Sequence, residues 1–249
     1  MLSYHNNILK IYNNPEIISK SQLLQEGRNL VFIYQNQSNQ DVVVKFFKKP
    51  KLIKALIYGS FRKSKAYRSY LYASKLIELG VGTPKPLGFF EEKKMGLLKM
   101  SYYCSQFIAP DYTFRDLTLD FNIPDFEKII RKFTQFTFNL HEKGVEFCDH
   151  SPGNTLIKKN DQGTYDFFLV DLNRMNFGQM SFEKRMKNFS RITKEPKIIS
   201  IISDEYAIIS NYDKDDIHQA IKDNVNQFQT KFQKKKAFKK KFFFWRKKK

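Results

Sequence analysis

Two runs of β-branched and aromatic residues begin the regular pattern of the chain. They occupy residues 29–34 and 41–47, and the polar segment 35–40 separates them. Runs of this composition joined by a short polar segment predict a β-hairpin. Lys45 falls inside the second run. Because successive strand side chains point to opposite faces, Lys45 either faces solvent or reaches into a site.

An amphipathic helix and two more strands follow the hairpin. Apolar side chains recur at helical spacing over residues 64–80, and the segment ends in Gly80, a common helix stop. The prolines within residues 81–86 prevent the helix from continuing. Residues 87–90 and 97–103 are predicted to be strands. The first hundred residues therefore predict strands, one helix and then strands.

The rest of the chain has mainly helical periodicity. Phenylalanine, isoleucine and leucine side chains form a helix-period apolar face over residues 126–140, which indicates packing against a core. Residues 181–202 and 213–232 are also predicted to be helices. His141 follows the first of these helices, and we interpret it as a structural hydrogen-bonding residue outside the candidate site.

Composition limits the class of protein. The chain has 249 residues, 41% hydrophobic and 28% charged, as in a soluble globular protein with one large domain or two lobes. Cys104 and Cys148 lie far apart, which argues against a zinc site or disulfide framework and favours a reducing compartment. The N-terminus lacks the apolar run of a signal peptide, and no run approaches the roughly 20 residues of a membrane helix. We therefore expect a cytoplasmic protein.

The positive charge is concentrated at the C-terminus. Of the net +19, residues 231–249 contribute eleven with no acid, and four aromatic residues stand in a row at 242–245. Lysine clusters interleaved with rings suit an anionic membrane surface. A solvated, disordered tail is the second interpretation, and binding to nucleic acid through phosphate neutralisation and base stacking is the third.

Candidate chemistry lies in residues 147–154 and in the strand that follows. Asp149 and Asn154 are five positions apart across a proline and a glycine, a segment that cannot be helix interior, so both side chains can turn toward one cavity. The apolar run 167–170 then ends in Asp171. Oxygen-bearing side chains at loop positions beside apolar runs are what a magnesium and phosphate site needs.

These residue types suit phosphoryl transfer. Magnesium prefers oxygen ligands and keeps waters and substrate phosphates, so Asn154 and Asp171 suffice if a nucleotide supplies the rest. Asp149 is then left for chemistry. D-x-x-x-x-N before a strand ending in Asp is the catalytic half of the protein-kinase-like signature, whose first Asp orients or deprotonates the acceptor hydroxyl. The same residues also form ordinary turns, and the surrounding order of helix, loop, hairpin and second acid favours the kinase interpretation.

From about residue 27 to residue 191 the chain resembles the bacterial lipopolysaccharide core kinases, the heptose and Kdo kinases of the protein-kinase-like superfamily. The most specific segments are S-K-A at 64–66, T-P-K-P at 83–86 and D-L-N-R at 171–174. The D-H-S-P-G-N loop at 149–154 is shared with aminoglycoside and choline phosphotransferases. That loop therefore indicates the superfamily rather than the substrate.

The resemblance implies an α+β, protein-kinase-like bilobal fold. A small β-rich N-lobe with one helix is expected over residues 1–103. A mainly helical C-lobe, containing the catalytic loop 147–154 and the metal-binding Asp171, is expected over residues 104–230. The basic aromatic tail occupies residues 231–249.

The resemblance also implies cofactors and roles. ATP and Mg²⁺ are the expected cofactors. Lys45 contacts ATP phosphates, Asp149 handles the acceptor hydroxyl, and Asn154 with Asp171 hold magnesium. The chain has no G-x-G-x-x-G, so phosphate cover has to come from the turn that contains Gly27 and Arg28.

The chain departs from the protein-kinase pattern in three further ways. Residues 70–72, in the middle of the predicted helix, contain no glutamate to pair with Lys45, and Glu78 comes late. The usual Phe-Gly after the second acid is Leu172-Asn173, and no A-P-E follows. These departures favour a small-molecule or glycolipid kinase over a protein kinase.

The predicted function is ATP- and magnesium-dependent phosphorylation of a sugar hydroxyl, on Kdo or heptose, of the lipopolysaccharide inner core. The protein is expected at the inner face of the cytoplasmic membrane, held by residues 231–249. Two alternatives remain open. One is a small-molecule phosphotransferase of the aminoglycoside or choline kinase type, and the other is a catalytically inactive kinase-like module that binds membrane or nucleic acid.

Overall fold

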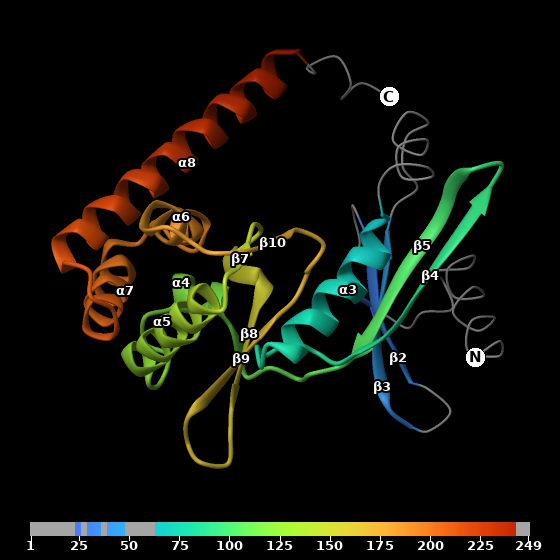
Figure 1. Cartoon of the computed structure of the whole chain (residues 1–249), viewed down its shortest axis with the longest axis horizontal. Helices are drawn as coiled ribbons and strands as arrows, with labels where there is room; N and C mark the ends of the chain where they lie inside the picture. Colours follow the sequence, from blue (N-terminus) through green and yellow to red (C-terminus); the bar gives the residue numbers. More distant parts are fainter. Residues whose placement is uncertain (1–22, 26–28, 36–38, 48–62, 243–249) are drawn as a thin grey trace. The chain divides into compact units, whose positions relative to one another are not determined.

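The computed structural model describes residues 23–25, 29–35, 39–47 and 63–242 (Figure 1). The chain forms two compact units, and each is described by itself. Unit 1 comprises Met1–Ala109 and Phe168–Arg174, and unit 2 comprises Pro110–Phe167 and Met175–Lys249. Gly27 and Arg28, the residues predicted to cover phosphate, lie outside the described residues, as do residues 243–249 of the tail.

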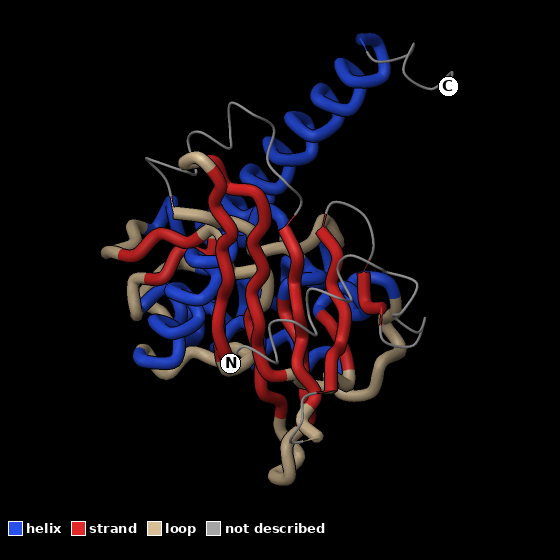
Figure 2. Tube along the Cα trace, turned by 90° about the vertical axis from the view of Figure 1, so that its right-hand side faces the viewer, coloured by secondary structure: helices blue, strands red, loops and turns tan. Residues whose placement is uncertain are grey.

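Unit 1 is built on a five-stranded antiparallel sheet, which Figure 2 shows with its strands side by side. The predicted hairpin is confirmed, because its two strands pair in register from Asn29 opposite Phe47 to Gln35 opposite Asp41. The strands follow the order β1-β2-β3-β5-β4, with bounds β1 (Leu23–Gln25), β2 (Asn29–Gln35), β3 (Asp41–Phe47), β4 (Pro86–Lys94) and β5 (Leu97–Gln106).

The alternation of side chains along β3 separates the core from Lys45. Val42, Val44 and Phe46 are buried and pack with Phe32 of β2 in one apolar cluster. Because side chains alternate along a strand, Lys45 lies on the opposite face of the sheet.

Helix α3 (Lys65–Glu78) packs on the same face of the sheet as Lys45. Lys45 is opposite Tyr103 of β5, which is in turn opposite Phe89 of β4. Residues directly opposite in antiparallel strands share a face. The rings of Tyr67 and Tyr70 on α3 lie 5.1 and 5.4 Å from the Phe89 ring, centroid to centroid. The Lys45 side chain therefore lies on the helix-covered face.

Capping fixes where α3 begins and ends. The hydroxyl of Ser64 accepts a hydrogen bond of 3.0 Å from the Tyr67 backbone N–H, which satisfies one of the unpaired donors of the first turn. After the helix, Gly80 adopts φ 63°, a conformation that favours glycine. The S-K-A segment is thus the capped start of this helix.

The end of strand β9 (Tyr165–Leu169) and Asp171, which follows it, belong to unit 1. The Leu169 N–H donates to the Gly82 carbonyl at 2.9 Å, and the Thr83 hydroxyl donates to the Leu169 carbonyl at 2.8 Å. The predicted division placed Asp171 with the second domain. The structure groups it with unit 1, in which these two bonds hold the end of β9 to Gly82 and Thr83.

Unit 2 is mainly helical, with the helices packed around one core. Its helices are α4 (Phe114–Leu119), α5 (Phe126–Glu142), α6 (Phe182–Asn188), α7 (Pro196–Ile209) and α8 (Lys214–Phe242). The short strands are β6 (Tyr112–Thr113), β7 (Val145–Phe147), β8 (Thr155–Lys159), β9 (Tyr165–Leu169) and β10 (Met175–Phe177). The core consists of buried aliphatic and aromatic side chains, among them Phe114, Leu117, Ile129, Ile130, Phe133, Met186, Ile198, Ile202, Tyr206, Ile217 and Ile221.

The prediction of a single helix over residues 181–202 is wrong. The structure has α6, then the 3-10 turn η3 (Phe189–Arg191), and then α7, which begins at Pro196. Proline is favoured in the first turn of a helix, where its missing N–H needs no partner, and it disfavours helical conformation in the residue before it. Pro196 therefore starts a new helix.

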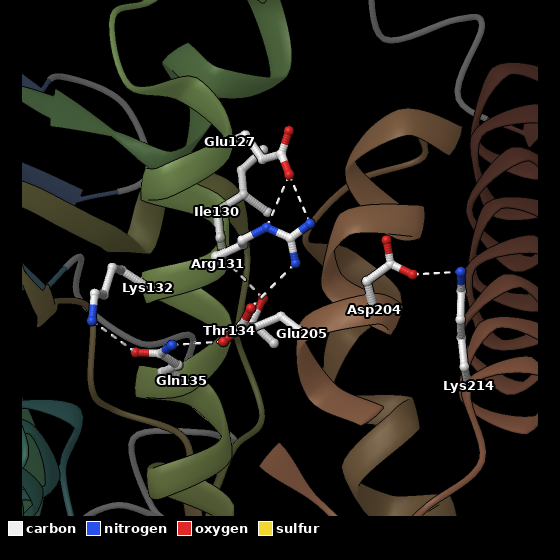
Figure 3. Close-up of polar contacts among 9 residues, drawn as sticks. All are labelled: Glu127, Ile130, Arg131, Lys132, Thr134, Gln135, Asp204, Glu205 and Lys214. Carbon is white, nitrogen blue, oxygen red and sulfur yellow. Dashed lines mark hydrogen bonds and ion pairs between the residues drawn. The ribbon is translucent and has the colours of Figure 1, made fainter. Parts of the chain in front are cut away.

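Polar contacts join α5, α7 and α8 (Figure 3). Arg131 on α5 donates to Glu127 on its own helix and, at 3.2 Å, to Glu205 on α7. The mostly buried Glu205 also accepts a hydrogen bond of 2.6 Å from the side-chain amide of Gln135. Because a buried carboxylate is costly unless paired, these two donors stabilise the α5–α7 contact. Lys214 at the start of α8 pairs with Asp204 of α7 at 2.5 Å.

Helix α8 continues past the predicted end at residue 232, to Phe242, and so includes part of the basic tail. Its C-terminal half extends beyond the other helices of unit 2 (Figure 1). Phe232 and Phe238 are 52% and 58% exposed. Among the described residues, no helix combines the length and apolar character that crossing a bilayer requires.

Candidate active site

Lys45 and Asp171 form an ion pair within unit 1. The Nζ–Oδ1 distance is 2.6 Å, and the Lys45 side chain is 13% exposed. The alternative in which Lys45 faces solvent is therefore wrong. Among the described residues, this is its one ion pair, so the carboxylate partner comes from the strand end and not from α3.

Asp171 has a second partner and an unusual backbone. The Asn173 side-chain amide donates to its Oδ1 at 2.6 Å. The backbone φ of Asp171 is 60°, a left-handed conformation that aspartate adopts more readily than most residues and that is often found at functional sites. Its side chain is 30% exposed, and both described partners contact Oδ1. Oδ2 is then available to a ligand.

Asp149 and Asn154 are brought together in unit 2. The loop between them follows β7 and contains the 3-10 turn η2 (Pro152–Asn154). The Asn154 side-chain amide donates to the Asp149 carbonyl at 2.8 Å. Because the amide nitrogen is engaged, the oxygen of Asn154 is the atom left to bind a ligand.

Arg191 holds the Asp149 carboxylate. Its Nη1 lies 2.6 Å from Asp149 Oδ1 and 3.4 Å from the Cys148 carbonyl oxygen. The guanidinium also lies over the Phe228 ring of α8, 5.4 Å from the ring centroid. The sequence contains no motif that points to Arg191, because the contact joins segments about 40 residues apart.

Asn188, at the end of α6, bridges two buried histidines to the chain before Asp149. Its Nδ2 donates to the Phe147 carbonyl at 3.0 Å, so its Oδ1 is the acceptor for His141 Nε2 and His150 Nδ1, both at 3.2 Å. His141 Nε2 and His150 Nδ1 must therefore each carry a proton. His141 Nδ1 is left as acceptor for the Tyr206 hydroxyl at 3.0 Å.

Burial keeps both histidines neutral. It lowers the pKa of His141 to about 3 and the pKa of His150 to about 4. Nε2 of His150 is buried and has no hydrogen-bond partner in the described part of the chain. A neutral ring with its proton on Nδ1 fits this position, because Nε2 then has no proton to donate. The structural interpretation of His141 agrees with these contacts.

Each unit offers one oxygen of the kind that magnesium prefers. Asn154 offers its amide oxygen and Asp171 its second carboxylate oxygen, and both are hard oxygen ligands. Asn154 lies in unit 2 and Asp171 in unit 1. In the described part of the chain, no group of three or more His, Cys, Asp or Glu side chains gathers as a metal site.

Comparisons with known proteins identify the fold. No family model matches the chain, and no curated protein matches it. Among solved structures, WaaP in complex with acyl carrier protein is similar, with a TM-score of 0.57 at 13% identity, over 90% of this chain and 91% of that chain.

The predicted kinase-like α+β fold is therefore confirmed. The match agrees with the sequence resemblance to the lipopolysaccharide core kinases. In all, 1477 chains of solved structures match. So widespread a fold does not select an acceptor by itself.

Proposed function

We propose that the protein is an ATP- and magnesium-dependent phosphotransferase that phosphorylates a sugar hydroxyl, on Kdo or heptose, of the lipopolysaccharide inner core. The observation that carries the proposal is the Lys45–Asp171 ion pair of 2.6 Å on a kinase-like fold. A site that binds phosphate and a metal ion requires a mostly buried lysine beside a carboxylate that has an oxygen available for the metal.

In the proposed reaction, Lys45 and Asp171 of unit 1 and Asn154 of unit 2 act on the nucleotide. Lys45 donates to ATP phosphates, with Gly27 and Arg28 as the proposed phosphate cover. Asp171 and Asn154 would hold magnesium, which when bound offsets the charge of the phosphates. Positioning and charge stabilisation supply most of the rate enhancement in phosphoryl transfer.

Asp149 acts on the acceptor. Arg191 engages Oδ1 and leaves Oδ2 to accept a hydrogen bond from the acceptor hydroxyl. Asn188 holds the chain just before Asp149 through the Phe147 carbonyl, so the carboxylate does not have to be ordered when the acceptor binds. Asp149 therefore orients the hydroxyl toward the transferred phosphoryl group and takes up its proton.

The acceptor is proposed from two agreeing lines of support. The S-K-A, T-P-K-P and D-L-N-R segments resemble lipopolysaccharide core kinases, and the chain has the fold of WaaP over most of its length. The alternatives are a small-molecule phosphotransferase and an inactive module. The acceptor assay below separates all three.

We propose that residues 231–249 hold the enzyme at the anionic inner face of the cytoplasmic membrane. Phe232 and Phe238 are exposed on α8 among exposed lysines, where rings can enter the headgroup region while cations meet lipid phosphates. Each basic residue near such a surface contributes about 1 kcal/mol, so the eleven of the tail suffice for loose attachment.

The test of catalysis is transfer of phosphate from Mg-ATP to purified core glycolipid, followed by mass spectrometry. One added phosphate on the glycolipid is expected, lost without magnesium. Transfer to aminoglycosides or choline alone would instead establish the small-molecule alternative. A magnesium-dependent thermal shift with ATP but no transfer to any acceptor would establish the inactive module.

The test of membrane attachment is binding to anionic vesicles, with zwitterionic vesicles and single-stranded RNA compared. Deletion of residues 231–249 should abolish vesicle binding and spare turnover of a soluble acceptor. Raised salt should mimic the deletion, because screening weakens surface attraction. Retained vesicle binding by the truncated chain, or preferred binding to RNA, would contradict the assignment of the tail.

A further inference from the structure

A second arginine lies against the 149–154 loop. A Cβ built on Gly153 would be 2.8 Å from Nη2 and 3.3 Å from Cζ of Arg115. Real Cβ atoms essentially never come within 3.0 Å of another heavy atom, so any other residue at position 153 would push the guanidinium aside, and glycine permits this approach. The guanidinium of Arg115 therefore packs on the backbone between Asp149 and Asn154.

Arg115 has no hydrogen-bond or ion-pair partner for its guanidinium among the described residues, and the residue is exposed. The adjacent acid, Asp116, forms no ion pair with Arg115 among the described residues, and its Oδ2 accepts from the Thr113 backbone N–H at 2.7 Å and from the Thr113 hydroxyl at 2.9 Å. The described structure thus leaves the guanidinium of Arg115 unpaired beside the loop.

The helix that carries Arg115 is well fixed. Phe114 and Leu117 of α4 are completely buried, and the Phe114 ring lies 4.2 Å from the Phe133 ring, centroid to centroid. Thr113 and Asp116 form a capping box at its N-terminus. A ligand that binds Arg115 therefore meets a cation whose backbone is already in place.

Arg191 at the other end of the loop has a different role. Its Nη1 is engaged by Asp149 and Cys148, and its Nε is buried. Arg191 is thus committed to holding the loop, whereas Arg115 has its donors available. This division leaves Arg115 as the residue of the pair that can bind a ligand.

We propose that Arg115 binds an anionic group, a carboxylate or phosphate, of the acceptor, and so selects acceptors that carry one near the hydroxyl to be phosphorylated. The proposal rests on the proposed function. An acceptor of this kind is repelled by the Asp149 carboxylate, and a guanidinium beside the same loop offsets that repulsion. The planar fork of arginine also matches a carboxylate or phosphate with two parallel hydrogen bonds.

The test compares Arg115→Gln and Arg115→Lys with the parent on three acceptors: Kdo as a soluble sugar acid, heptose as a neutral sugar, and core glycolipid. Lys158→Gln is the matched control, because Lys158 is an exposed cation of unit 2 on β8. We expect Arg115→Gln to lower kcat/KM for Kdo by about tenfold or more, mainly through KM. For heptose and for ATP the parameters should change less than about twofold, and Arg115→Lys should recover part of the loss.

The outcomes separate the sources of the anion and the competing explanations. Dependence on Arg115 with Kdo places the anion on the acceptor sugar, and dependence with glycolipid alone places it elsewhere on the lipid-linked glycan. Equal loss for neutral and anionic acceptors, or the same loss in Lys158→Gln, overturns the proposal. If the parent phosphorylates none of the acceptors, the proposed function fails, and calorimetric binding of Kdo decides this proposal. Kdo binding that Arg115→Gln weakens supports the proposal, and binding that it leaves unchanged overturns it.

Discussion

Asp171 and Asp149 are held in different ways. Asp171 pairs with Lys45 of β3, in the same unit, and with Asn173, two residues along the chain. Asp149 pairs with Arg191, and its loop is held by Asn188, about 40 residues away. The position of the Asp171 carboxylate therefore depends on Lys45 of β3 and on the residues next to Asp171 in the chain. The position of the Asp149 carboxylate depends on the packing of α6, η3 and α8.

The difference follows from what each group is proposed to do. A metal ligand needs an open oxygen and tolerates adjustment, because the ion and its waters complete the geometry. A carboxylate that orients a hydroxyl must be fixed before the acceptor arrives, since small misplacements are costly in rate. The buried Asn188 network provides that fixation for Asp149 and has no counterpart among the described partners of Asp171.

The largest expected effect comes from Asp149→Asn. The change keeps the shape of the side chain and removes the proton acceptor, so turnover should fall by roughly 10²–10⁴-fold. Unfolding free energy should change by about 1 kcal/mol or less, because the lost ion pair with Arg191 is partly exposed. Steady-state kinetics and chemical denaturation measure the two quantities.

The exposed Asp161 in the turn between β8 and β9 provides the control for this variant. Asp161→Asn should leave turnover at the parental level. If Asp149→Asn retained parental turnover while folded, Asp149 would be an ordinary turn residue, and the contrast between the two carboxylates would lose its functional meaning.

Lys45→Met is expected to have the next largest effect. Methionine keeps the apolar stem and deletes the charge, so nucleotide use should fall by roughly 10²–10³-fold without unfolding of the sheet. Lys93→Met, at an exposed position of β4, is the control. Equal ATP kinetics in Lys45→Met and the parent would mean that the Lys45–Asp171 pair is structural only.

Local pattern predicted much of the fold, and the motif order supplied the four central candidates of the site. Two β-branched and aromatic runs joined by a polar segment identified the β2–β3 hairpin, and the motif order proposed Lys45, Asp149, Asn154 and Asp171 as site residues. Neither could predict Arg191, Asn188 or Arg115, because their contacts join segments that no fixed spacing connects. The end of the helix before Pro196 did have a signal in the sequence, the proline itself. The prediction of one helix over residues 181–202 followed the helical periodicity instead.

Asn188→Asp tests whether the buried network positions Asp149. Aspartate keeps an acceptor for both histidines and loses the donor to the Phe147 carbonyl, so turnover should fall by roughly ten- to hundredfold with little change in KM for ATP. The added negative charge should also raise the pKa of both histidines, and this change reports the altered network independently of turnover. Asn226→Asp on the exposed face of α8 is the control. Parental turnover with raised histidine pKa values would show that the network does not position Asp149.

The smallest effect is a pH dependence of stability that arises from His141 and His150. Their pKa values of about 3 and about 4 in the folded protein lie below the ordinary value of 6.5. Between pH 6.5 and about 4 the unfolded chain therefore takes up protons that the folded chain does not. Stability falls as pH decreases through this window, by at most about 1.4 kcal/mol per pH unit for each histidine.

Denaturation between pH 5 and 7 measures this slope before most carboxylates titrate. Nuclear magnetic resonance should find no titration of His141 or His150 above pH 5, with the proton on Nε2 of His141 and on Nδ1 of His150. Midpoints near 6.5 would mean that both rings are accessible to water. The network that holds the Asp149 loop would then be as open to solvent as the surroundings of Asp171, and the contrast between the two carboxylates would disappear.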